Sequence, residues 1–215
     1  MATISYLTTT IFDFGAIKSL PTEMKALGIR RPLLVTDAGV QNAGIAAQVL
    51  SHIDQPNVTV FADTPPNPTE EAVRMGVDAY RNSGCDGVIA LGGGSPIDLA
   101  KGVALAATHG GSLEQYAAIH GGVGKITDKV APVIAIPTTA GTGSEVGRGA
   151  LLNLTNGSKL ALISPYLIPK RAICDPELTL GLPPLLTAAT GIDALTHCIE
   201  TVSYTHLTLP TNREV

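Results

Sequence analysis

The stretch CDGVIALGGGSPIDLAK, at residues 85–101, decides the fold of this 215-residue chain. It predicts a buried strand, then three consecutive glycines, then a helix that opens at Ser95. The glycines allow positive φ and let backbone N–H groups approach a ligand with no Cβ in the way. We expect Ser95 to cap the helix, Pro96 to occupy its first turn and Asp98 to complete a capping box.

Strand-like and helix-like segments alternate around this stretch. Residues 88–91 and 133–137 are apolar along their whole length, which is typical of strands covered on both faces. The pattern predicts an α/β fold with a Rossmann-like, doubly wound parallel sheet. The expected strands lie at 30–37, 57–63, 85–93 and 131–139, and the expected helices at 43–53, 69–84 and 95–110.

The C-terminal third predicts a change of organisation. Residues 149–163 form two apolar runs about a polar turn and predict a β-hairpin, and a short strand is expected near Arg171–Asp175. The prolines and glycine that follow mark a domain boundary, so residues 1–184 are expected to form the α/β domain. Residues 185–203 have helical spacing and predict the start of an all-helical second domain. Residues 204–215 are threonine-rich and contain a proline, so we expect an unrelated tail that does not continue the helix; a frayed C-terminus is the alternative.

Composition excludes several classes of function. Fourteen Lys and Arg against 18 Asp and Glu supply no basic field, which argues against nucleic-acid binding. No apolar run reaches the roughly 20 residues that cross a bilayer, and the N-terminus lacks the features of a signal peptide. A cytoplasmic protein without membrane contact is therefore expected. The three cysteines have no CxxC spacing, so a thiolate zinc cage is not indicated.

The glycine loop is the first candidate binding element. Gly93, Gly94 and Ser95 lie where a strand gives way to a helix N-terminus, and the free N–H groups and helix dipole there suit a pyrophosphate. A tight turn without a ligand is the alternative, and the GxGxxG fingerprint of common Rossmann domains is absent. Asp37 follows an earlier strand, where its carboxylate can accept from ribose hydroxyls and repel a 2′-phosphate. This favours NAD over NADP, although such an aspartate also often satisfies a turn.

A second loop, IAIPTTAGTGSEVGR at residues 134–148, also leaves a buried strand. Its hydroxyl side chains can donate to phosphate, ribose or nicotinamide oxygens, and two such loops at neighbouring strand ends predict one cleft. An irregular surface loop is the alternative. The candidate residues of this loop are Thr138, Thr139, Thr142 and Ser144.

Asp193 and His197 are the candidate metal ligands. They are four residues apart on the expected helix, so both lie on one face with their side chains together. A carboxylate and an imidazole suit Fe²⁺, Zn²⁺ or a similar divalent ion. The same spacing also arises in surface ion pairs.

With these residues, the chain resembles the iron-containing, metal-dependent alcohol dehydrogenase family, in its N-terminal portion. The resemblance implies a dehydroquinate synthase-like fold and a dinucleotide held by both loops, including Asp98, with Asn67 and Lys159 as further contacts. It implies that Asp193 and His197 are the first two metal ligands and that a homodimer forms. The motifs that carry the resemblance are PPNPT at 65–69, GGGSPIDLAK at 92–101, PTTAGTGSE at 137–145, SPYLIPKRAICDPELTLGLPP at 164–184 and GIDALTHCIE at 191–200.

The resemblance further implies NAD(P)-dependent interconversion of a short alcohol or diol and its aldehyde or ketone. A relative of the glycerol dehydrogenases or maleylacetate reductases is the alternative within enzymes. The family continues as a helical domain that supplies two more histidines to the metal, whereas this chain stops, so we expect NAD(H) binding with little or no turnover. An inactive nucleotide-binding fragment with an exposed apolar helix face at residues 185–202 is the alternative from a different class.

Overall fold

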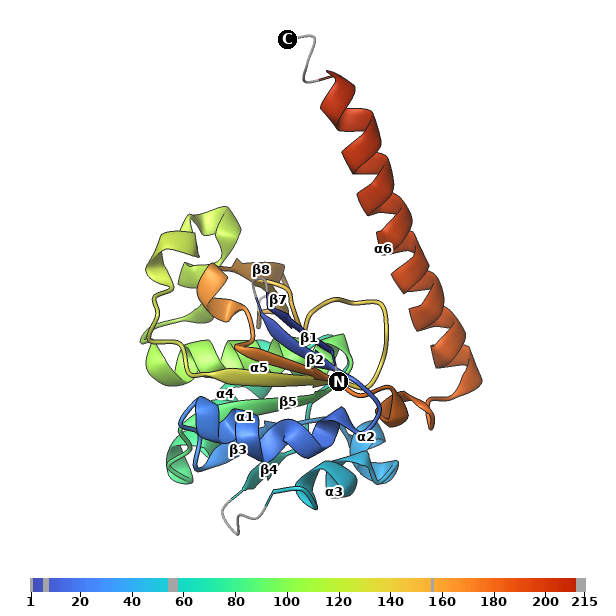
Figure 1. The fold of residues 1–215 in the computed structure, drawn as a ribbon. Coiled ribbons are helices and arrows are strands. Elements are labelled where there is room, and N and C mark those ends of the chain that lie inside the picture. Colours follow the sequence, from blue (N-terminus) through green and yellow to red (C-terminus); the bar gives the residue numbers. More distant parts are fainter. Residues whose placement is uncertain (1, 6–7, 54–57, 156, 212–215) are drawn as a thin grey trace.

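The computed structural model describes residues 2–5, 8–53, 58–155 and 157–211. Its centre is a seven-stranded sheet in the order β1-β2-β9-β6-β5-β3-β4, in which every neighbouring pair is parallel except β1 and β2. The expected doubly wound parallel sheet is confirmed, and the antiparallel β1–β2 pair at its edge is an addition that the sequence pattern did not predict (Figure 1). The strands are β1 (Ala2–Ser5), β2 (Thr9–Phe12), β3 (Pro32–Val35), β4 (Thr59–Phe61), β5 (Gly87–Gly92), β6 (Val133–Pro137), β7 (Gly149–Asn153), β8 (Lys159–Ile163) and β9 (Arg171–Cys174).

Helices cover both faces of this sheet (Figure 1). The α-helices are α1 (Leu20–Ala26), α2 (Ala38–Asn42), α3 (Ile45–Leu50), α4 (Glu70–Asn82), α5 (Gly94–Thr108) and α6 (Pro184–Thr211). Short 3₁₀ segments are η1 (Ala16–Ser19), η2 (Leu113–Tyr116), η3 (Ala118–His120), η4 (Gly122–Lys125), η5 (Pro165–Leu167) and η6 (Pro176–Thr179).

The alternation of side chains along β5 feeds two separate cores. Val88 and Ala90 belong to the cluster that includes α4 and α5, whereas Ile89 and Leu91 belong to the cluster that includes α1 and α3. All four are fully buried, because each face of the strand is covered. This explains why β5 is apolar along its whole length rather than alternating with polar residues.

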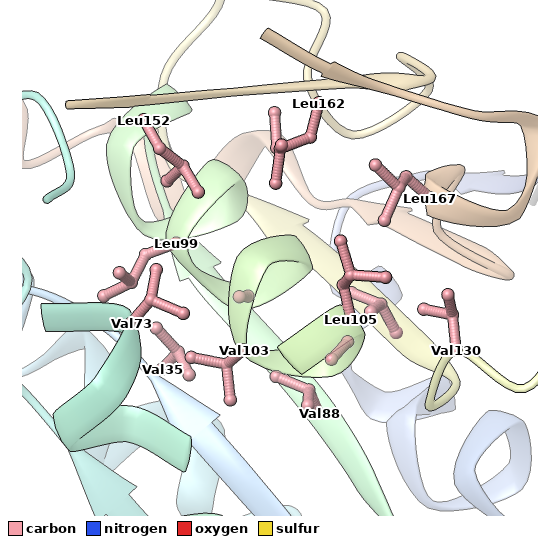
Figure 2. Close-up of a cluster of buried hydrophobic side chains, with 14 of the residues drawn as sticks. Val35, Val73, Val88, Leu99, Val103, Leu105, Val130, Leu152, Leu162 and Leu167 are labelled. Atoms are coloured by element: carbon pink, nitrogen blue, oxygen red, sulfur yellow. The ribbon is translucent and has the colours of Figure 1, made fainter. Parts of the chain in front are cut away.

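Helix α5 lies between the sheet and the hairpin β7–β8. Figure 2 shows Leu99, Val103 and Leu105 of this helix within the buried cluster, together with Leu152 and Leu162 of the hairpin. The hairpin pairs Gly149 with Ile163 and Asn153 with Lys159, which confirms the expected antiparallel turn. Burial on both sides of α5 anchors the N-terminal end of this helix at the edge of the sheet.

The long helix α6 leaves the α/β domain and points away from it (Figure 1). It begins at Pro184, one residue before the expected boundary, because proline suits the first turn of a helix. The expectation that the helix stops before Tyr204 is wrong, since α6 runs to Thr211. Extending an existing helix adds a hydrogen bond for each residue ordered, and Pro210 is the next-to-last residue of α6. Within the described ranges, no helix has the length and apolar character to cross a membrane.

Candidate functional site

Two adjoining pockets lie at the carboxyl ends of the parallel strands. The larger, of about 680 Å³, lies over the loops that follow β3, β5 and β6, and the smaller, of about 370 Å³, lies beside the hairpin. Gly94, Ser95 and Thr142 line both. The larger pocket collects the predicted cofactor residues Asp37, Gly93, Gly94, Ser95, Thr138, Thr139 and Thr142. The smaller collects Asn67, Asp98, Ser144 and Lys159 in addition to those shared. The structure therefore brings all eleven predicted residues to one cleft.

The N-terminus of α5 lies at this cleft and has no capping side chain, so the expected cap by Ser95 and the capping box with Asp98 are wrong. The helix begins at Gly94, its N-cap is Gly93, and no side chain accepts a cap hydrogen bond there. Ser95 lies inside the first turn because the Ile97 N–H already bonds the Gly93 carbonyl, and Asp98 bonds elsewhere. The first amides of α5 consequently have no capping side chain, which leaves them free for an anionic ligand.

The glycines of this loop are required by close contacts. Gly92 has φ of +143°, and a Cβ there would lie 2.6 Å from the Cγ of Pro96. A Cβ at Gly94 would lie 3.0 Å from the Cγ2 of Thr142, and one at Gly93 would lie 3.2 Å from the Oγ1 of Thr139. The glycine loop and the second loop (residues 138–149, here called the hydroxyl loop) are thus in direct contact across the cleft floor.

Asp37 is placed both to cap a turn and to face the cleft, the two roles that the sequence left open. Its Oδ1 accepts from the Val40 N–H at 2.9 Å and caps α2. Its Oδ2 would lie 3.4 Å from a Cβ at Gly92, and the residue lines the larger pocket. One carboxylate oxygen therefore satisfies the turn, while the second faces the glycine loop.

Lys101 is a site residue that the sequence reasoning missed. Its side chain is fully buried, and its Nζ donates to the Ser144 Oγ at 2.9 Å and to the carbonyls of Gly147 and Gly149 at 3.0 and 2.7 Å. Ser144 in turn donates to the Oδ1 of Asp98, which lies 3.8 Å from the Lys101 Nζ. The only signal in the sequence is a lysine within the otherwise apolar run LAKGVALAA.

Burial lowers the pKa of the Lys101 ammonium from 10.5 to about 8, although the carboxylates of Asp98 and Glu145 oppose the shift. Between these two values the unfolded chain keeps the proton and the folded chain has released it, so stability rises with pH in this window. We expect the free energy of unfolding of the wild type, relative to Lys101→Met, to increase by about 3 kcal/mol in total from pH 8 to 10.5. Urea unfolding of both proteins at several pH values measures this. Parallel pH curves for the two proteins would show that Lys101 does not titrate here.

Asn67 and Lys159 meet at the rim of the smaller pocket. The Lys159 Nζ donates to the Asn67 Oδ1 at 3.4 Å. Asn67 has φ of 56°, a left-handed conformation that asparagine tolerates better than most residues. The sequence placed these residues together only through the family resemblance, because they are distant in the chain.

Asp193 and His197 lie together on α6, as the spacing predicts. The Asp193 Oδ1 is 3.9 Å from the His197 Nε2, and each side chain is about half exposed. The His197 Nδ1 lies 2.8 Å from the Gly141 carbonyl, which can only accept, so Nδ1 carries the proton and, in the neutral ring, Nε2 has the lone pair beside Asp193. This is the arrangement that metal-binding histidines use. Among the described residues, no group of three or more His, Cys, Asp or Glu side chains is placed to hold a metal ion.

The glycine at position 141 lets α6 approach the hydroxyl loop. Gly141 has φ of +104°, and a Cβ there would lie 2.6 Å from the Oδ2 of Asp193. The pair on α6 is therefore seated against the same loop that forms the cleft.

A parallel sheet wound on both faces, with its cleft at the carboxyl ends of the strands, defines a doubly wound α/β domain of the Rossmann-like class. Residues 8–176 match the family model of the iron-containing alcohol dehydrogenases. The chain belongs to the iron-containing alcohol dehydrogenase family.

Three relatives illustrate this membership. The 4-hydroxybutyrate dehydrogenase of Cupriavidus necator is 59% identical over 201 residues, which are 94% of this chain and 53% of that protein. The NAD-dependent methanol dehydrogenase of Bacillus methanolicus is 39% identical over 89% of this chain and 50% of its own length. The crystal structure of sulfoacetaldehyde reductase from Bifidobacterium kashiwanohense in complex with NAD⁺ superposes with a TM-score of 0.80 at 35% identity, over 88% of this chain and 50% of that one. The chain spans about half the length of the relatives it matches.

Proposed function

We propose that this chain is the nucleotide-binding part of an NAD-dependent alcohol dehydrogenase that uses a divalent metal. The observation that carries the proposal is the open N-terminus of α5, with Gly93 and Gly94 at its start and the hydroxyl loop against it. Such a terminus holds a pyrophosphate through backbone N–H groups and the helix dipole. Relatives named as NAD-dependent, or solved with NAD⁺, support the choice of cofactor.

Different residues of the cleft are proposed to contact different parts of the dinucleotide. We propose that the free Oδ2 of Asp37 accepts from the adenosine ribose and that Thr138, Thr139 and Thr142 donate to phosphate or ribose oxygens. Asn67 and Lys159, at the far end of the cleft, hold the nicotinamide half. Asp98 and Ser144 bond each other and Lys101, so their contribution is to shape the pocket wall.

Asp193 and His197 fit a divalent ion, because the His197 tautomer leaves Nε2 free beside a carboxylate. We propose Fe²⁺, with Zn²⁺ as the alternative, and a short alcohol or diol with its aldehyde or ketone as substrate. The bound ion and NAD would supply Lewis acidity toward the substrate oxygen and a hydride acceptor. Catalytic metal sites usually have three protein ligands, and among the described residues Asp193 and His197 are joined by no third one, so we expect weak binding of the ion and low turnover.

A second candidate is a nucleotide-binding module without catalysis, and the surface of α6 favours it. Five large apolar side chains of this helix are at least half exposed. A group of exposed apolar side chains is typical of a surface that packs on another protein segment. They are Leu185, Leu186, Ile192, Leu195 and Ile199. Assays with Fe²⁺, NAD⁺ and a panel of 4-hydroxybutyrate, 1,3-propanediol and methanol separate the candidates, because the first predicts low turnover that depends on the metal, whereas the second predicts none.

Titration with NADH and NADPH, followed by nicotinamide fluorescence, tests the proposal. We expect saturable NADH binding and weaker NADPH binding. Replacing Asp37 with alanine is expected to weaken NADH binding about tenfold and to narrow the preference over NADPH, because the repulsion of a 2′-phosphate disappears. Asp78→Ala, on the outer side of α4, is the matched control that removes a carboxylate away from the cleft. Absence of binding to either nucleotide by the folded wild type would overturn the proposal.

A further inference from the structure

We propose that Lys101 is a positioning residue for the nucleotide cleft, and that its side chain sets the spacing between the glycine loop and the hydroxyl loop. This inference rests on the proposed function, since it concerns how the cleft holds a nucleotide. Lys101 does not line either pocket, so its effect on a ligand would pass through the loop that it holds.

The hydrogen bonds of Lys101 tie a distant loop to α5. An ammonium has three N–H donors, and here each finds an acceptor in the hydroxyl loop: Ser144, Gly147 and Gly149. The side chain is completely buried, so water does not compete for these bonds. The three acceptors span six residues of the loop, which a single contact could not orient.

Asp98, one turn before Lys101 on α5, also forms hydrogen bonds that hold the hydroxyl loop. Its Oδ1 accepts from the Ser144 hydroxyl, and its Oδ2 accepts from the Leu151 N–H at 3.0 Å. The negative charge of Asp98 also lies 3.8 Å from the Lys101 ammonium. Two side chains of one helix therefore hold the loop from Ser144 to the first residues of β7.

The tied part of the loop continues directly into the part that meets the glycines. Thr142, two residues before Ser144, lies against Gly94, with 3.0 Å between the Thr142 Cγ2 and the position of a Gly94 Cβ. The Ser144 N–H also donates to the Thr142 Oγ1 at 3.3 Å. A shift of Ser144 would consequently move Thr142 and change the width of the cleft that both pockets share.

An apolar side chain of similar length could fill the space but could not make these bonds. Methionine at position 101 removes the donor to the Gly147 and Gly149 carbonyls and the positive charge beside Asp98. Partly buried carbonyls without a donor and an Asp98 carboxylate without its counter-charge both favour movement of the loop toward water. The expected consequence is a less ordered hydroxyl loop in a domain whose core remains packed.

Lys101→Met, measured in the full chain, tests the proposal. We expect the dissociation constant for NADH to rise about 10- to 100-fold and amide hydrogen exchange to accelerate in residues 138–149. Lys101→Gln, which keeps a neutral N–H donor, should recover part of the affinity. If the methionine variant fails to fold, the glutamine variant carries the same comparison.

Met24→Ala is the matched control, because Met24 is buried in α1 and lies in the other core cluster. It should lower stability without altering exchange in the hydroxyl loop or the affinity for NADH. Wild-type affinity in a folded Lys101 variant, or unchanged exchange in the loop, would overturn the positioning role while leaving the proposed function intact. Failure of the wild type to bind NADH would instead overturn the proposed function, and the exchange measurement would still decide whether Lys101 orders the loop.

Discussion

Gly94→Val is expected to weaken NADH binding by at least about 100-fold while leaving the domain folded. A Cβ at this position would already lie 3.0 Å from the Cγ2 and 3.3 Å from the Cβ of Thr142, and valine adds two further methyl groups. Gly94 lines both pockets, so these methyl groups would occupy space that the phosphates need. Fluorescence titration with NADH, together with circular dichroism to verify folding, measures the effect.

Gly124→Val is the matched control for this substitution. Gly124 is exposed, has no atom within 4 Å of the position of its Cβ and lies outside both pockets of the cleft. We expect NADH affinity equal to that of the wild type. Tight NADH binding by folded Gly94→Val would show that the nucleotide does not approach the start of α5, and the site proposed here would be wrong.

Leu105→Ala is expected to lower the free energy of unfolding by about 3 kcal/mol, the largest effect on stability that we anticipate. Leu105 is fully buried on α5, and in Figure 2 it lies beside Val130 and Leu167, on the side of the helix away from Val73. Removing its isobutyl group leaves a cavity, because α5 is held by the sheet on one side and the hairpin on the other. Urea unfolding followed by circular dichroism gives the difference.

The comparison for Leu105 is Leu180→Ala, at a position that is 80% exposed. That variant should differ from the wild type by less than about 0.5 kcal/mol, as is usual for exposed positions. A change of less than about 1 kcal/mol for Leu105→Ala would mean that the hairpin closes over the gap, and that α5 is held less firmly than its burial indicates.

Packing of α5 in the core fixes the position of its N-terminus at the cleft. The same helix that packs Leu99 and Leu105 into the core presents Gly94 to the proposed nucleotide site and Lys101 to the hydroxyl loop. Because the core holds α5 on two sides, its N-terminus has a defined position at the edge of the sheet. A nucleotide site made of backbone N–H groups depends on that position more than on any particular side chain.

Local patterns were sufficient for the central strands, α4, α5 and the hairpin, but β1, β2, α1 and α2 were not predicted. The run of apolar residues in β5, the glycines after it and the spacing in α5 are all contained in residues 85–108, so their structure follows from neighbouring residues. The hairpin at 149–163 was predicted for the same reason. The end of α6 was not predicted, because threonine content and Pro210 indicate a stop in local terms, whereas α6 continues to Thr211.

The hydrogen-bond partners of the polar side chains were not predictable from the sequence. The sequence placed Ser95 and Asp98 in a capping box, because in local terms the cap is the nearest available partner. In the fold, Asp98 bonds Ser144 and Leu151, which are 46 and 53 residues away, and Gly93 serves as the N-cap. The role of Lys101 is not predictable from local sequence, because its three hydrogen-bond acceptors lie more than 40 residues away in the chain.

The sequence by itself determined that this chain is a doubly wound α/β domain with two loops rich in glycine and hydroxyl side chains and a carboxylate–imidazole pair four residues apart, because strand burial, glycine content and helical spacing are local properties. Only the tertiary structure decided that the hydroxyl loop rests on Gly94, that Lys101 holds this loop from beneath and that Gly141 fixes the tautomer of His197. Each of these contacts joins residues more than 40 positions apart, and the first two form when α5 is buried between the sheet and the hairpin, whereas the third forms when α6 meets the hydroxyl loop.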